Sequence, residues 1–187
     1  MKRAILSTAL TLSVMTLSAG PMAAGAQTSL PAAKDLSSYL DTYWYVPQAY
    51  LLAYKYTPHG SPAVTAVNDQ TIWHITGVAN GYMTGCSFTS TDGKGAKWSA
   101  STLVGSVTAS DTVSIGFFSK DGVVVGQGTM APVDGQTAFL MQMSAMPGAV
   151  GLTHWAYMLP VTPADASWSS LPGTRGVSVT TATADGC

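Results

Sequence analysis

Residues 112–145 read TVSIGFFSKDGVVVGQGTMAPVDGQTAFLMQMSA. Runs of β-branched, aromatic and alternating residues are separated in this stretch by Asp-Gly dipeptides. Four dipeptides of the kind favoured in tight hairpin turns punctuate the chain: Asn80-Gly81, Asp92-Gly93, Asp121-Gly122 and Asp134-Gly135. The stretch therefore predicts antiparallel strands that follow one another through hairpin turns.

Working outward from these turns, eight runs are predicted to be strands: 50–56, 71–77, 82–91, 98–108, 112–119, 123–130, 136–144 and 152–161. No interval between them is long enough for a helix that crosses over to a parallel strand. A meander of this length either closes into a barrel or splits into two packed sheets. We expect a single-domain, all-β, up-and-down antiparallel barrel over residues 35–161, because closure removes exposed edges, with a β-sandwich as the alternative.

A short N-terminal helix is predicted to begin at Asp35 and to end before Pro47. Its apolar and aromatic residues have the spacing of one helical face: Leu36, Tyr39, Leu40 and Tyr43. A short helix, an aromatic strand opening at residues 43–45 and a meander together resemble the arrangement of calycin barrels. The Gly-x-Trp motif of lipocalins is absent, so the resemblance concerns architecture and assigns no family.

Composition excludes several classes of protein. The 187 residues carry a formal net charge of −1, with 9% charged and 47% hydrophobic residues. One ordinary domain with a sizeable core is expected, without the basic excess of a nucleic-acid binder. All acidic residues are Asp, which favours turns over helices.

The first 26 residues have the pattern of a cleaved signal peptide. Lys2 and Arg3 precede an apolar stretch at 4–19, and residues 24–26 supply the small A-x-A site. We expect cleavage after Ala26 and a flexible leader at 27–34. The apolar stretch is too short and too rich in Ser and Thr for a membrane anchor, so the prediction is a soluble periplasmic or secreted protein without stable membrane insertion.

The two cysteines, Cys86 and Cys187, are predicted to pair in that oxidising compartment. The bond would tie the C-terminal tail, residues 162–187, to a strand in the middle of the chain. Closing a loop of this length contributes roughly 4 to 5 kcal/mol in the chain-entropy account. Two free thiols are the alternative.

Three histidines carry most of the candidate chemistry: His59, His74 and His154. None has a partner at the spacing of a known metal site, so no metal is predicted. His74 and His154 each lie within a predicted strand beside a Trp. If their faces point inward, they share one lumen and can orient a ligand or act as acid and base. The alternative is an ordinary hydrogen-bonded histidine. Asp69 directly precedes the strand of His74. It is either an ordinary turn residue or a functional residue at the mouth of the barrel.

Aromatic and sulfur-containing side chains complete the candidate ligand-binding set of His74, His154, Trp44, Tyr54 and Met141. Trp44 and Tyr54 belong to a Tyr-rich segment that suits amphipathic ligands, protein contacts or core packing. Met141 begins a Met-rich run that suits an adaptable pocket or plain core filling.

No nucleophile motif and no phosphate-binding glycine pattern is present, so no catalytic residue and no cofactor is predicted. The leading hypothesis is an exported barrel that binds a small, mostly apolar or amphipathic molecule in its lumen. The alternatives are a small barrel enzyme of the isomerase, lyase or cyclase type that uses a His base, and a cell-envelope protein that makes contacts through its tyrosines. Oligomeric state stays open.

Overall fold

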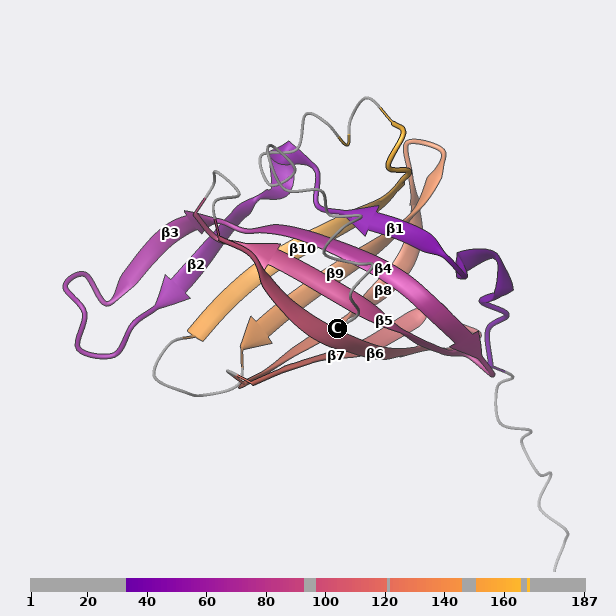
Figure 1. The fold of residues 1–187 in the computed structure, drawn as a ribbon, viewed down its shortest axis with the longest axis horizontal. Coiled ribbons are helices and arrows are strands. Elements are labelled where there is room, and N and C mark those ends of the chain that lie inside the picture. Colours follow the sequence, from indigo (N-terminus) through magenta and orange to yellow (C-terminus); the bar gives the residue numbers. More distant parts are fainter. Residues whose placement is uncertain (1–32, 93–96, 121, 146–150, 166–167, 169–187) are drawn as a thin grey trace, which may run out of the picture. The chain divides into compact units, whose positions relative to one another are not determined.

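A computed structural model describes residues 33–92, 97–120, 122–145, 151–165 and 168. All of them lie within one compact unit, Pro31–Cys187. Figure 1 shows that strands make up nearly all of it. The described elements are η1 (Ser37–Tyr39), β1 (Thr42–Tyr45), η2 (Gln48–Tyr50), β2 (Leu52–Tyr56), β3 (Val64–Asn68), β4 (Gln70–Ala79), β5 (Tyr82–Ser90), β6 (Ser99–Val107), β7 (Thr112–Ser119), β8 (Gly122–Val133), β9 (Gln136–Ala145) and β10 (Gly151–Val161), where η denotes a 3₁₀-helix.

Eight strands close into an antiparallel barrel. Neighbours follow the order β1-β4-β5-β6-β7-β8-β9-β10, and β1 also pairs with β10, which closes the sheet. From β4 to β10 each strand pairs with the next along the chain. The predicted up-and-down barrel is confirmed, and the sandwich is not formed.

Two of the four turn dipeptides form the tight turns predicted for them, whereas the connection at Asp92-Gly93 is longer and runs from Ser90 at the end of β5 to Ser99 at the start of β6. Asn80 and Gly81 have φ angles of 50° and 78°, and Asp134 and Gly135 have 49° and 79°. Two successive residues with positive φ are the mark of a type I′ hairpin, which matches the twist of the flanking strands. Gly93 and Asp121 lie outside the described residues.

The N-terminal helix is shorter than its sequence pattern. Only Ser37–Tyr39 is helical, as one 3₁₀ turn, and Tyr43 belongs to strand β1. Asp41 takes a left-handed φ of 58°, and its N–H donates to the carbonyl of Ile75 on β4. The backbone therefore leaves the helix at Asp41, and its hydrogen bonds continue in the sheet.

The predicted strand at 50–56 is not the one that closes the barrel. Leu52–Tyr56 (β2) pairs with β3, a strand that the sequence reading missed, and with the first part of β10. Where β1 pairs with β4, the numbers of the two paired residues add up to 117, as for Trp44 and Trp73. Where β2 pairs with β3 they add up to 120, as for Leu52 and Asn68, so the register shifts by three residues. The two pairs thus form one long hairpin with three extra residues on its first arm, where η2 lies.

Alternation separates the barrel into an inner and an outer apolar cluster. The inner cluster contains Trp44, Trp73, Phe139, Met141 and Met158 among others, all buried. The outer cluster consists of Ile72, Cys86, Phe88, Val161 and Trp168. Trp73 and Ile72, which are neighbours on β4, therefore point to opposite sides of the sheet.

The two ends of the barrel differ. At one end, tight turns follow β4, β6 and β8, Leu36 is buried in the core, and Lys34 forms an ion pair with Asp111. The other end holds the cavity described below. Among the described residues, none of the helices has the length and apolar character needed to cross a membrane.

Close strand packing leads to a stability prediction. A Cβ at Gly128 would lie 2.0 Å from the carbonyl oxygen of Leu140 on β9, whereas a Cβ at Gly151 would meet its nearest atom at 3.9 Å. Gly128→Ala should therefore lower the free energy of unfolding by about 1–3 kcal/mol, and Gly151→Ala should change it by less than about 0.5 kcal/mol. Urea unfolding of both variants measures this difference, and equal effects would contradict the packing described here.

Candidate functional site

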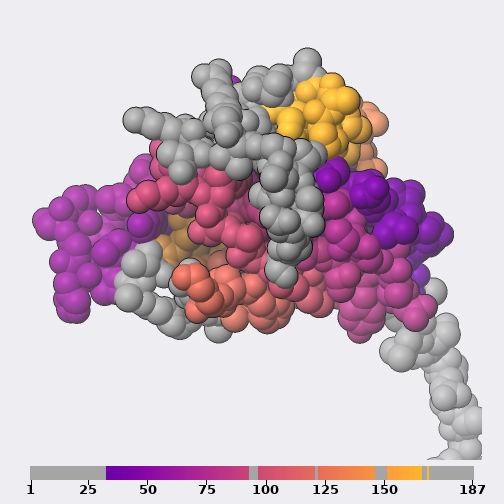
Figure 2. Space-filling view, in the orientation of Figure 1, coloured from indigo at the N-terminus to yellow at the C-terminus, as the bar shows by residue number. Residues whose placement is uncertain are grey.

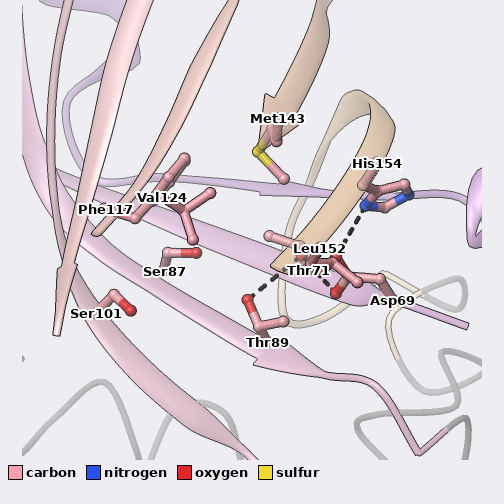
Figure 3. Close-up of a pocket in the computed structure, with 10 residues that line it drawn as sticks. All are labelled: Asp69, Thr71, Ser87, Thr89, Ser101, Phe117, Val124, Met143, Leu152 and His154. Atoms are coloured by element: carbon pink, nitrogen blue, oxygen red, sulfur yellow. Dashed lines mark hydrogen bonds and ion pairs between the residues drawn. The ribbon is translucent and has the colours of Figure 1, made fainter. Parts of the chain in front are cut away.

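A cavity lies at the end of the barrel opposite the tight turns. Because neighbouring strands are antiparallel, this end collects the first residues of β4, β6, β8 and β10 and the last residues of β5, β7 and β9. Figure 3 shows the side chains that line it: Asp69, Thr71, Ser87, Thr89, Ser101, Phe117, Val124, Met143, Leu152 and His154.

The cavity has a polar wall and an apolar wall. Hydroxyl groups come from β4 to β6, and apolar side chains come from β7 to β10. The cavity has a volume of about 60 Å³, so it is small. The site therefore suits a small molecule with one polar side and one apolar side.

A buried ion pair forms part of the cavity lining. His154 Nδ1 lies 3.0 Å from Asp69 Oδ2, and the side chains are 0% and 1% exposed. The other ring nitrogen, Nε2, lies 2.8 Å from the backbone carbonyl oxygen of Tyr50. The pair belongs to the cavity wall, with Asp69 just before β4 and His154 on β10 (Figure 3).

The two partners determine the charge of His154. The Tyr50 carbonyl can only accept a hydrogen bond, so Nε2 carries a proton, and an Nδ1 that also donates to Asp69 makes the ring an imidazolium. Burial, the largest influence, lowers the pKa of His154, but the hydrogen bond and the charge of Asp69, together with the Tyr50 carbonyl, raise it above its ordinary value. The raised pKa widens the pH range in which the pair is an imidazolium beside a carboxylate, and both ring nitrogens face protein groups instead of the cavity.

Local chain geometry explains how these groups meet. Asp69 is the single residue between β3 and β4, and its N–H donates to the carbonyl of Leu51. Tyr50 ends η2, the insertion on the opposite arm of the long hairpin. His154 lies on β10 opposite Ala53. The His154 side chain thus joins β10 to η2 and to the junction of β3 with β4, where the long hairpin changes register.

The two histidines do not share a lumen. Trp73 and Ile75 point into the inner cluster, so His74, between them on β4, lies on the outer face. There its Nε2 lies 2.8 Å from Oδ1 of the exposed Asp41, and its ring stacks on Tyr43 at a centroid distance of 4.1 Å. His74 is a mostly buried histidine on the outer face of the sheet, with an exposed aspartate partner, apart from the cavity.

The other predicted ligand residues lie elsewhere. Trp44 and Met141 are buried in the inner cluster, where Trp44 packs against Phe139. Tyr54 is 54% exposed. Of the five predicted residues, His154 is the one among the cavity's lining residues.

An exposed apolar face lies on the β2–β3 hairpin and the adjoining part of β10. Figure 2 shows the hairpin, in purple, projecting from the barrel at the left. Its outer face presents side chains that are more than half exposed: Leu52, Tyr54, Tyr56 and Val64, with Trp155 on β10. Two tyrosines of the Tyr-rich segment, Tyr54 and Tyr56, therefore lie on the surface.

Cys86 is buried in the outer cluster with Trp168. Cys187 lies outside the described residues, so the disulfide between them stays a prediction. The described part of the chain contains no group of three or more metal-ligating side chains.

Comparisons of this chain with known protein families, with curated proteins and with solved structures found no significant match.

Sequence reasoning missed most of the lining residues. Asp69 is a candidate from the sequence, but its partner His154 is 85 residues away in the chain. Thr71, Ser87 and Thr89 look like ordinary strand residues. The available signal was their position, since hydroxyl residues at alternate sites near the ends of predicted strands can line one mouth of a barrel.

The raised pKa of His154 predicts how stability depends on pH. Folding takes up a proton at pH values between the ordinary histidine pKa of 6.5 and the higher folded value. The contribution of His154 to stability is thus complete below about pH 6.5 and is lost as pH rises through its folded-state pKa, because a neutral ring leaves one nitrogen lone pair facing an acceptor.

Urea unfolding between pH 6 and 9 should show this loss of stability in the parent protein. His154→Gln should flatten the profile and lower stability by about 3–5 kcal/mol, since it leaves Asp69 buried without its counter-charge. His74→Gln is the matched control and should cost less than about 1 kcal/mol, because the partner of His74 is exposed. An unchanged pH profile in His154→Gln would show that His154 is neutral in the fold.

Proposed function

We propose that this chain is an exported, soluble β-barrel protein that binds a small amphipathic molecule in the cavity at the end of its barrel. The observation that carries the proposal is the two-sided lining, with hydroxyls from β4 to β6 opposite apolar side chains from β7 to β10. A ligand of a few non-hydrogen atoms fits the space, with its apolar part against Phe117 and Met143 and its polar part toward Ser87 and Thr89.

Binding is favoured over catalysis by the state of His154. A general base needs a free nitrogen lone pair within reach of the substrate. Both nitrogens of His154 are held by acceptors that belong to the protein. The isomerase, lyase or cyclase hypothesis would require the Tyr50 carbonyl to release Nε2.

A pair of adjacent substitutions tests the binding site. Val124 lines the cavity, whereas Val125 lies on the outer face and is 41% exposed. Val124→Trp should fill the cavity and abolish ligand retention, and Val125→Trp should leave it intact. The measurement is native mass spectrometry of the mature protein purified from its own exported fraction, compared with the spectrum after denaturing extraction.

The expected result is a small-molecule adduct that is lost on extraction, present in the parent and in Val125→Trp, and absent in Val124→Trp. An adduct that survives in Val124→Trp would place the ligand elsewhere. A bare protein mass in all three would count against retention of a ligand in the cavity.

Export and disulfide formation are part of the proposal. Trp168, which follows β10 in the chain, packs in the outer cluster with Cys86, so this residue lies on that face of the barrel. This placement supports pairing of Cys86 with Cys187. The mature protein should begin at Gln27, and its unreduced mass should be about 2 Da below that of the reduced chain, because the bond replaces two S–H hydrogens. A full-length mass, or no change on reduction, would contradict these assignments.

A second candidate function rests on the exposed apolar face. Contiguous exposed aromatic side chains are typical of protein contact sites, and Tyr54 and Trp155 are both more than half exposed. A contact with another envelope protein should be weakened by Trp155→Ser and unaffected by Val124→Trp. The reverse pattern would assign function to the cavity.

A further inference from the structure

The polar wall of the cavity carries a continuous chain of hydrogen bonds. His154 Nδ1 lies 3.0 Å from Asp69 Oδ2, Thr71 Oγ1 lies 3.2 Å from Asp69 Oδ1, and Thr89 Oγ1 lies 3.4 Å from Thr71 Oγ1. Dashed lines in Figure 3 follow this chain from the histidine to Thr89. Each of these groups belongs to the cavity lining.

In this series of hydrogen bonds, each donor points toward Asp69. Asp69 Oδ2 faces His154, and Asp69 Oδ1 accepts a hydrogen bond from Thr71. The single hydroxyl proton of Thr71 is therefore donated to Asp69 Oδ1. Thr71 has no second proton for Thr89, so Thr89 is the donor in the contact between the two hydroxyls.

This direction leaves Thr89 as an acceptor. Its one proton points toward Thr71, and its remaining lone pairs are available on the cavity wall. The ionic members of the lining, Asp69 and His154, neutralise each other and offer the cavity no unpaired charge. An uncharged donor beside Thr89 leaves this arrangement intact, whereas a carbonyl, ether or carboxylate oxygen would have to draw the Thr89 proton away from Thr71.

We infer that the cavity selects small uncharged molecules that donate a hydrogen bond to Thr89 Oγ1, with alcohols as the simplest class. This inference rests on the proposed function, because it assumes that the cavity binds a ligand. Beyond the proposed function, the inference specifies that the polar end of the ligand is a hydrogen-bond donor. The hydroxyls of Ser87 and Ser101 can rotate to serve either role, so the selectivity comes from Thr89.

Two isomeric probes test the selectivity. 1-Butanol and methyl propyl ether have the same atoms and similar size, but only the alcohol donates a hydrogen bond. NMR titration of the mature protein, followed at the methyl groups of Val124 and Met143, measures the affinity of each probe for the cavity. The parent protein should bind the alcohol at least about tenfold more tightly than the ether.

Variants on one strand provide the controls. Thr89→Val should reduce the preference for the alcohol to less than about twofold, and Thr89→Ser should restore it because the hydroxyl returns. Thr84→Val makes the same substitution at an exposed position of β5, away from the cavity lining, and should leave the preference unchanged.

The outcomes separate the two levels of the proposal. Equal affinity for both probes, or a preference for the alcohol that survives Thr89→Val, would overturn the inference while leaving a ligand-binding cavity in place. Failure of both probes to shift the cavity methyl groups would overturn the proposed function together with the inference.

Discussion

The cavity end of this barrel depends on the ion pair between Asp69 and His154. The pair is fully enclosed, and the second ring nitrogen of His154 is held by the carbonyl of Tyr50. Through it β10 is joined to the junction of β3 with β4 and to η2. Those are the points at which the long hairpin changes register by three residues, so the pair holds an irregular part of the sheet in a defined position. Buried charges persist only when they are paired and hydrogen-bonded, as both are here.

The same constraint shapes the chemistry of the site. An imidazolium with both N–H groups donated to the protein contributes no base to the cavity, so the pair organises the wall instead of acting on a ligand. Its carboxylate orients the hydroxyl of Thr71, which in turn orients that of Thr89. Under the proposed function, this structural requirement of the fold determines which groups a ligand can present to the polar wall, and the opposite apolar wall supplies the rest of the contact.

Local patterns predicted the barrel well, because hairpin turns and alternation are short-range properties. Asn80-Gly81 and Asp134-Gly135 form the turns expected of them. The errors arise where tertiary pairing overrides a pattern: Tyr43 has helical spacing but pairs with β4 and β10, and the barrel is closed by β1 instead of β2. The faces of His74 and His154 depend on where each strand meets the core, which alternation alone does not determine. The contact of Asp69 with His154 spans 85 residues and leaves no local trace.

We infer that His154 is a buried imidazolium at neutral pH. Nitrogen-15 NMR of the mature protein, with histidine labelled in the ring and His154 assigned through His154→Gln, tests it directly at pH 7. We expect two protonated ring nitrogens, each with an N–H resonance protected from exchange with water. A single protonated nitrogen, with the other at the chemical shift of a free lone pair, would contradict it.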